Sequence, residues 1–150
     1  MKAVTTNRRA RHDHEILETY EAGMVLVGSE VKSLREGQVN LKDSYASVRD
    51  GELWLVGCHI APYVFSRLGG HLPERDRKLL LHRREIDRLS AKLAEKGLTL
   101  IPLKIYFKEG KAKIELGLGR GKRTYDKRQS LKAKEQKREM DRAMRNKGRR

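Results

Sequence analysis

The sequence predicts a mainly β protein with short helices, built as a small closed antiparallel barrel with a basic C-terminal tail. Two hairpin patterns and the spacing of short apolar segments indicate five or six strands. A change of charge near Gly119 marks the end of the barrel, because residues 120–150 contain fourteen Lys or Arg against four Asp or Glu. We therefore expect a barrel over residues 1–119 and a tail over residues 120–150 that is disordered when free.

The N-terminal elements are predicted as a basic arm followed by a strand. Residues 1–11 hold three arginines and have no apolar run that could serve as a secretion signal, so we expect a cytoplasmic protein. Residues 15–27 are rich in apolar and β-branched side chains on both sides of Gly23. This composition is typical of a strand, and the glycine predicts a bend in it.

A short helix and a hairpin are expected next. Ser29 is a capping residue and Gly37 is a typical helix terminator, so a helix of about two turns is predicted between them. Residues 45–56 form two strand-like segments around Asp50-Gly51, a dipeptide that readily adopts the positive φ angles of a two-residue turn. The turn fixes the register of this first hairpin.

The following segment is predicted as a loop, a helix and a longer hairpin. Residues 66–76 are rich in glycine and charge, whereas residues 83–96 have apolar side chains at helical spacing and are followed by Gly97. Residues 103–116 alternate between apolar and polar side chains across Glu109-Gly110, which predicts a hairpin with one buried face. Closure of these strands into a barrel would remove the exposed edges that an open sheet leaves.

The sequence contains no pattern of catalysis or membrane insertion. It has no Walker loop, nucleophile elbow, zinc-protease motif or paired cysteines, and no apolar segment of the roughly 20 residues that a membrane span needs. Cys58 is the only cysteine and is interpreted as a core residue. His12-Asp13-His14 could bind a metal but is more typical of surface groups, and Gly117-Leu-Gly-Arg-Gly could hold phosphate but is more typical of a flexible exit from the barrel. We expect no enzyme activity, no metal and no cofactor.

The charge predicts a polyanionic partner. The net charge is +15, and although one basic run is usually only a solvated face, basic residues recur here in three clusters. The clusters are Arg8, Arg9 and Arg11; Arg75, Arg77, Lys78, Arg83 and Arg84; and Arg120, Lys122, Arg123, Lys127 and Arg128. Neutralisation of about six phosphates would give a log–log salt slope of about −4. RNA is favoured over DNA, because apolar or ring side chains of the leucine triplet 79–81 and His82 can pack on unstacked bases. All three leucines could be core, but we expect at least one to be core and one or two to face outward.

Five segments in order along nearly the whole chain carry a family resemblance: Asn7-Arg-Arg-Ala-Arg-His-Asp, Tyr20-Glu-Ala-Gly, Gly28-Ser-Glu-Val-Lys-Ser-Leu-Arg, Arg77-Lys-Leu-Leu-Leu-His-Arg-Arg-Glu-Ile and Gly121-Lys-Arg-Thr-Tyr-Asp-Lys-Arg. They resemble the bacterial SsrA-binding protein family, also called small protein B. The resemblance implies an OB-fold-like closed antiparallel β-barrel that binds the tRNA-like domain of tmRNA (SsrA RNA) and delivers it to stalled ribosomes. It also implies contacts with 16S and 23S rRNA, elongation factor Tu in the delivery complex, a monomer and no bond chemistry.

The same resemblance implies the site residues. Glu30 falls on an RNA-gripping acidic position, where a carboxylate can accept from base amino and imino groups. The expected RNA-binding residues are Glu30, Lys32, Arg77, Lys78, Leu80, Leu81 and His82, with Arg8, Arg9 and Arg11. The residues that match the segment entering the decoding centre, and one apolar tail position, are Gly121, Lys122, Arg123, Tyr125, Asp126, Lys127, Arg128 and Met144. The tail is expected to become a helix in the vacant mRNA channel.

Two other classes of function compete with this interpretation. A structural or assembly protein of the ribosome would have the same charge and tail, but it would stay bound to ribosomes that hold a full-length message. A small nucleic-acid enzyme would need paired carboxylates or a metal cluster, and the sequence argues against both.

Overall fold

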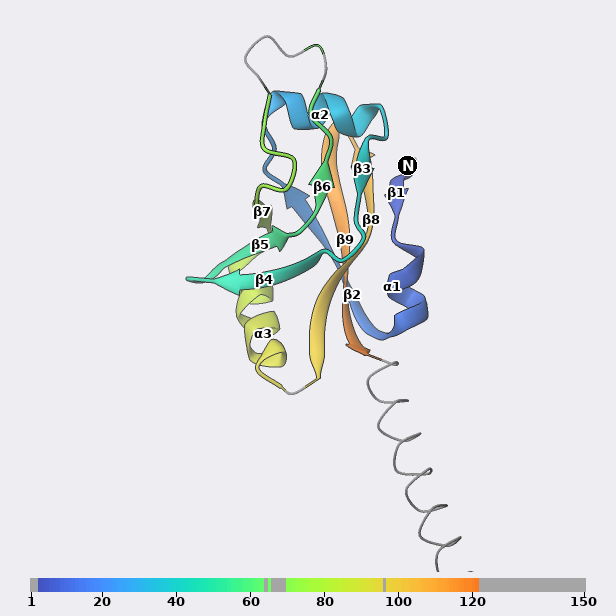
Figure 1. Ribbon diagram of the computed structural model, residues 1–150. Coiled ribbons are helices and arrows are strands. Elements are labelled where there is room, and N and C mark those ends of the chain that lie inside the picture. The colour runs from blue at the N-terminus through green and yellow to red at the C-terminus, as the bar shows by residue number, and fades with distance from the viewer. Residues whose placement is uncertain (1–2, 64, 66–69, 96, 122–150) are drawn as a thin grey trace, which may run out of the picture.

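The computed structural model describes residues 3–63, 65, 70–95 and 97–121. Within these residues it has nine strands and three helices (Figure 1). In chain order the elements are β1 (Ala3–Thr6), α1 (Arg8–Asp13), β2 (His14–Met24), α2 (Gly28–Arg35), β3 (Val39–Asn40), β4 (Tyr45–Arg49), β5 (Glu52–Val56), β6 (His59–Ile60), β7 (Arg77–Leu80), α3 (Arg83–Leu93), β8 (Leu98–Lys108) and β9 (Lys111–Gly121). No helix in the described part of the chain is long and apolar enough to cross a membrane.

Seven of the strands belong to one antiparallel sheet. Their order is β1-β8-β4-β5-β7-β2-β9, and β9 also pairs with β8. The pairings that start at β8 therefore return to β8 through β4, β5, β7, β2 and β9, and β1 is attached outside this ring of six strands. The two short strands β3 and β6 pair separately. The architecture is mainly β with short helices, as predicted, but has more strands than the expected five or six.

Both predicted hairpins are present, and their turns have the expected backbone. Asp50 and Gly51 have φ angles of 53° and 76°, and Glu109 and Gly110 have φ angles of 52° and 77°. Positive φ at both central residues matches the right-handed twist of the flanking strands, which is why Asp-Gly and similar pairs favour this turn. The second hairpin is longer than predicted, because β8 and β9 each contain eleven residues.

The N-terminal segment differs from the predicted basic arm. Residues 3–6 pair with β8 as strand β1, and residues 8–13 form helix α1. Asn7 makes this possible, since its side chain caps α1 by accepting from Ala10 N at 3.3 Å and donates to Pro102 O at 3.0 Å. Ala10 is buried against Ile101. The arm prediction was wrong because Asn7 was not recognised as a cap.

Three local boundaries also differ. The irregularity in β2 lies between Ile16 and Glu18, while Gly23 continues the pairing with β9. Helix α2 begins after Val27 rather than at a Ser29 cap, because the Glu30 carboxylate accepts the Val27 N–H at 2.9 Å. Helix α3 ends at Leu93, before the predicted residue 96.

The core fills the space between the sheet and the helices. It contains leucines and isoleucines from β5, β7, β8 and β9, Ala22 of β2 and Ala46 of β4, together with Leu34 of α2 and Leu89 of α3, which are both completely buried. Full burial of each such side chain contributes about 1.5–3 kcal/mol. Residues 117–121, for which a phosphate loop or a flexible exit was considered, lie in β9. A Cβ on Gly117 would approach Leu103 Cδ1 to 3.0 Å, so this glycine allows close packing instead.

The predicted boundary between barrel and tail lies two residues before the end of β9. Gly121, the last described residue, still pairs with His14 of β2. Residues 122–150, and with them most of the predicted tail, lie outside the described residues.

Candidate RNA interface

The acidic site residue Glu30 is completely buried at the start of α2. Its carboxylate accepts from Arg75 Nη2 at 2.5 Å, from Arg77 Nε at 2.6 Å and from Val27 N at 2.9 Å. Burial alone would raise the pKa of Glu30, but the hydrogen bonds from Arg75, Val27 and Arg77 outweigh it and lower this pKa below its ordinary value. Glu30 is therefore an ionised group whose acceptor atoms are occupied by the protein's own donors.

Arg77 is the buried partner of Glu30. Its guanidinium also donates to Cys58 O and, at 2.9 Å, to Pro73 O. These bonds tie the first turn of α2, the residues before β6 and the segment that leads into β7 into one unit. Neither Glu30 nor Arg77 is exposed. The structure thus places two of the expected RNA-binding residues inside the molecule, where they hold neighbouring backbone in place.

Exposed apolar side chains lie on the chain segments that adjoin this buried pair. Leu80 is 52% exposed on β7 and lies opposite Gly23 of β2, while Val25 donates its N–H to Lys78 O at 3.0 Å. Val25 and Val27 are each almost half exposed. We call this surface the Leu80 patch, and define it as Val25, Val27, Lys78 and Leu80. Such an exposed cluster on a small soluble protein is typical of a binding surface.

The leucine triplet divides as the sequence predicted. Leu79 is buried in the core, Leu81 is half-buried against it, and Leu80 faces outward. The absence of a side chain at Gly23 helps to expose Leu80, because a Cβ there would lie 3.4 Å from Leu80 Cβ and 3.7 Å from Lys113 Nζ. Lys113 of β9 therefore adds a cation at the edge of the patch.

The remaining expected residues lie in three places. His82 is exposed and directly precedes α3, so β7 brings it near Leu80. Lys32 is exposed on α2, with its ammonium 5.4 Å from the centre of the Tyr63 ring. The exposed residues Arg8, Arg9 and Arg11 lie on α1, on the other side of the ring from β7 (Figure 1). The structure therefore joins the β7 residues and His82 into one surface and separates the α1 arginines from it.

Of the residues expected to contact the ribosome, only Gly121 belongs to the described part of the chain. Gly121 ends β9, whereas Lys122, Arg123, Tyr125, Asp126, Lys127, Arg128 and Met144 lie outside the described residues.

Sequence reasoning missed the residues that flank Lys78. Trp54 of β5 pairs with Lys78 of β7 and with Ser47 of β4. The Arg49 guanidinium lies 5.4 Å from the centre of the Trp54 ring. The hairpin register could have indicated this arrangement, because Leu53 and Leu55 point into the core and alternation turns Trp54 to the outer face.

The candidates for chemistry are the metal site considered at residues 12–14 and the thiol of Cys58. No cluster of three or more metal-ligating side chains is present among them, and His12 contacts Asp13 at 3.0 Å. Burial raises the pKa of the Cys58 thiol to about 11, so this thiol is protonated at neutral pH.

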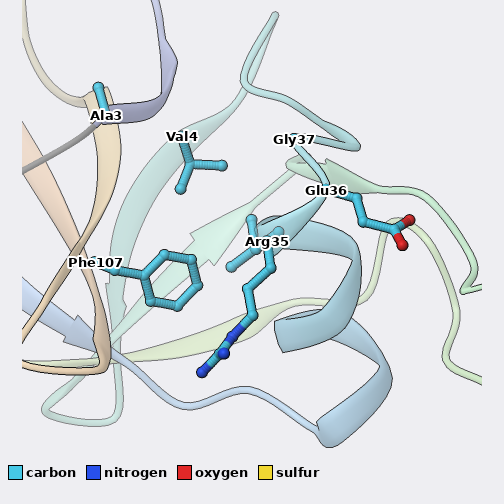
Figure 2. Close-up of a pocket in the computed structure, with 7 residues that line it drawn as sticks. Ala3, Val4, Arg35, Glu36, Gly37 and Phe107 are labelled. Atoms are coloured by element: carbon cyan, nitrogen blue, oxygen red, sulfur yellow. The ribbon is translucent and has the colours of Figure 1, made fainter.

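A pocket of about 390 Å³ lies between β1, the end of α2 and β8 (Figure 2). Its aromatic wall is Phe107, and the Arg35 guanidinium lies 5.5 Å from the centre of that ring. None of the expected RNA-binding residues lines this pocket.

Comparison with known proteins identifies the family. The family model of the SmpB protein matches residues 4–146. An SsrA-binding protein of Syntrophobacter fumaroxidans is 59% identical over 94% of this chain and 88% of its own, and one of Sulfurihydrogenibium is 56% identical over 97% and 96%. A solved chain from a study of tmRNA-SmpB and the bacterial ribosome is 59% identical, with a TM-score of 0.67 over 79% of this chain and 83% of its own. The chain belongs to the SmpB family of SsrA-binding proteins.

Proposed function

We propose that the protein binds the tRNA-like domain of tmRNA and delivers it to stalled ribosomes for trans-translation. The observation that carries this proposal is a basic chain of the SmpB family with the exposed Leu80 patch, which has Lys113 at its edge. The protein acts by binding and performs no bond chemistry itself. Ribosome rescue therefore depends on RNA binding. The affinity for the RNA comes from charge, and the selectivity for one RNA comes from shape.

The Leu80 patch provides contacts of two kinds. Its apolar side chains can pack on bases that the folded RNA leaves unstacked, whereas Lys78 and Lys113 can bind the adjoining phosphates. His82 extends the patch toward α3 and adds a ring that can stack. This combination suits a compact RNA with splayed bases better than a regular duplex, whose base faces are covered.

Glu30 and Arg77 contribute to the same site by positioning it. Their pair anchors Val27 and the segment before β7, and these two pieces of backbone carry the Leu80 patch. The expected direct contact between Glu30 and a base would require the carboxylate to leave Arg75 and Arg77. We therefore assign Glu30 a role in holding the patch in shape.

The ring of strands is interpreted as an OB-type barrel. The pairings among six strands return to their start, as they do in a closed barrel. Such barrels bind oligonucleotides on an outer face, and β5 and β7 would supply that face here. The basic helix α1, with Arg8, Arg9 and Arg11, would contact phosphates elsewhere on the RNA or on the ribosome.

Within this proposal, the basic tail binds the ribosome. Residues 120–150 have a net charge of +10, which suits a channel lined with rRNA phosphates. Within the proposal, residues 121–128 enter the decoding centre, Tyr125 stacks on an exposed base, and Met144 lies on the apolar side of a helix that forms in the vacant mRNA channel. The proposed assembly is cytoplasmic and contains one copy of the protein, tmRNA, elongation factor Tu and the ribosome with its 16S and 23S rRNA.

The proposal is tested by Leu80→Ala in a filter-binding assay with the tRNA-like domain. Since loss of a base contact typically costs about 1–3 kcal/mol, we expect affinity to fall by about tenfold. Leu80 is half exposed, so the free energy of unfolding should change by less than about 1 kcal/mol. Leu17→Ala is the matched control, because Leu17 is 45% exposed on β2 outside the patch, and it should leave affinity unchanged.

A wild-type chain with no preference for the tRNA-like domain over an unrelated folded RNA would contradict the proposal. The alternative, a structural or assembly protein of the ribosome, makes a different prediction for cells. It would be recovered on ribosomes translating full-length messages, whereas a rescue factor is recovered with tmRNA and on stalled ribosomes.

A further inference from the structure

We infer that Trp54 is a base-stacking anchor, so that the RNA interface extends from the Leu80 patch across β5 to β4. This inference rests on the function proposed above and adds a contact to the same site. None of the expected RNA-binding residues lies on β4 or β5. Trp54 is also the only tryptophan of the chain, which makes its environment directly measurable.

The position of Trp54 is fixed by its strand. Leu53 and Leu55 on either side of it are completely buried, and side chains alternate along a strand, so Trp54 lies on the outer face of the sheet. Its cross-strand partners are Ser47 of β4 and Lys78 of β7. Because Lys78 belongs to the Leu80 patch, the indole and the patch share one continuous surface.

The charged neighbours of the ring are held by exposed ion pairs. Arg49 Nη2 donates to Asp76 Oδ2 at 2.7 Å, and Lys78 Nζ donates to Glu52 Oε1 at 3.0 Å. The side chains in both pairs are between 39% and 49% exposed. Exposed pairs of this kind contribute little to stability, so a phosphate can replace either carboxylate at small cost. Arg49 and Lys78 are thus cations placed on the two strands beside the ring.

RNA with an unstacked base is the partner that fits this surface. Trp54 is partly exposed and the Arg49 guanidinium lies over its ring, so a base can stack on the indole while Arg49 and Lys78 contact the adjoining phosphates. A regular duplex offers no free base face. A second copy of this chain is disfavoured, because each copy carries a net charge of +15.

The test is a fluorescence titration of the full chain with the tRNA-like domain of tmRNA. We expect Trp54 emission to change on binding, with the same midpoint that filter binding gives. Trp54→Leu should weaken binding by about tenfold, the loss typical of one stacked base, and Trp54→Phe should retain most of the affinity because it keeps an aromatic face.

A third variant separates an RNA contact from a structural role. Asp76→Asn removes a carboxylate that competes with phosphate for Arg49, so it should tighten RNA binding by about twofold or more. A purely structural Arg49–Asp76 pair would give no such gain. Phe107→Leu is the matched control: it removes the aromatic partner of another arginine, Arg35, away from the interface (Figure 2), and should not change affinity.

Unchanged Trp54 emission together with normal binding by Trp54→Leu would overturn the inference and leave the proposed function standing. Failure of the wild-type chain to prefer the tRNA-like domain would instead overturn the proposed function. Emission that changes with protein concentration in the absence of RNA would indicate a second copy on this face, and it would also overturn the inference.

Discussion

Glu30 and Arg77 illustrate why a residue type does not specify its role. Both are completely buried, and the carboxylate is surrounded by donors from Arg75, Arg77 and Val27. A buried ion pair adds little net stability over a well-packed apolar pair, but removal of one partner leaves an uncompensated charge. The pair therefore stabilises this particular arrangement of α2 and β7, on which the exposed patch depends.

A double-mutant cycle tests this positioning role. Glu30→Gln should lower the free energy of unfolding by about 3–5 kcal/mol, because Arg77 then remains charged and buried. Arg77→Met should cost a similar amount, whereas the double variant should recover part of the loss in a denaturant titration. Recovered RNA binding by the double variant would support positioning. A folded, stable double variant that still fails to bind would show that Glu30 or Arg77 contacts the RNA directly.

The same carboxylate predicts a dependence of stability on pH. Because the pKa of Glu30 is below its ordinary value of 4.5 in the folded protein, its ionised form stabilises the fold above that pH. This contribution is lost as pH falls below 4.5 and through the folded pKa. The difference in unfolding free energy between wild type and Glu30→Gln should therefore be constant near neutrality and shrink in acid. Chemical denaturation between pH 3 and 7 measures it, and a pH-independent difference would contradict it.

At the scale of elements, local turn chemistry was predictable and capping was less so. Asp50-Gly51 and Glu109-Gly110 determine their hairpins through positive φ angles, which short sequence patterns encode well. Helix α1 depends on Asn7, whose side chain bonds to Pro102 more than ninety positions away, and no local pattern encodes that contact. Likewise, the sequence predicted that one or two leucines of the triplet face outward and the family resemblance singled out Leu80, but the burial of Glu30 arises only when α2 meets β7.

The glycines of β9 are constrained by close packing in the sheet. The sequence favours a loop for Gly117 and Gly119, yet both lie in strand β9, which pairs with β2 and β8. A Cβ on Gly117 would lie 3.1 Å from Ile16 Cγ2, next to the irregularity in β2. The glycine is required by the close approach of neighbouring side chains, a tertiary cause that composition cannot reveal.

Gly117→Ala should accordingly destabilise the fold by about 1–3 kcal/mol, the usual cost of overpacking a core. Thermal unfolding followed by circular dichroism measures the change. Gly28→Ala is the matched control, since a Cβ there meets nothing within 4 Å and the residue begins α2, so its stability should stay equal or rise slightly. Equal stabilities of the wild type and Gly117→Ala would contradict the close packing of this site.

For the whole molecule, charge is divided between two functions. Residues 1–121 include the described helices and strands and the Leu80 patch, while residues 122–150 add thirteen Lys or Arg against four Asp or Glu. Counterion release makes such a segment attractive to any polyanion. The tail alone therefore cannot select one RNA, and selectivity for the tRNA-like domain has to come from the folded part.

Truncation after Gly121 tests this division. It keeps the whole of β9, including its pairing with His14, so the folded part should remain intact. We expect affinity for the tRNA-like domain to change by only a few-fold, while tagging of stalled nascent chains in a reconstituted reaction is lost, because nothing would then enter the decoding centre and the vacant channel.

A chain whose residues 122–150 are scrambled keeps the charge and serves as the control. It should bind RNA like the wild type but also fail to tag, since the proposed function places Tyr125, Lys127 and Met144 at fixed positions along the tail. Normal tagging by the truncated chain would refute the role of the tail, and loss of RNA binding on truncation would show that the folded part does not select the RNA.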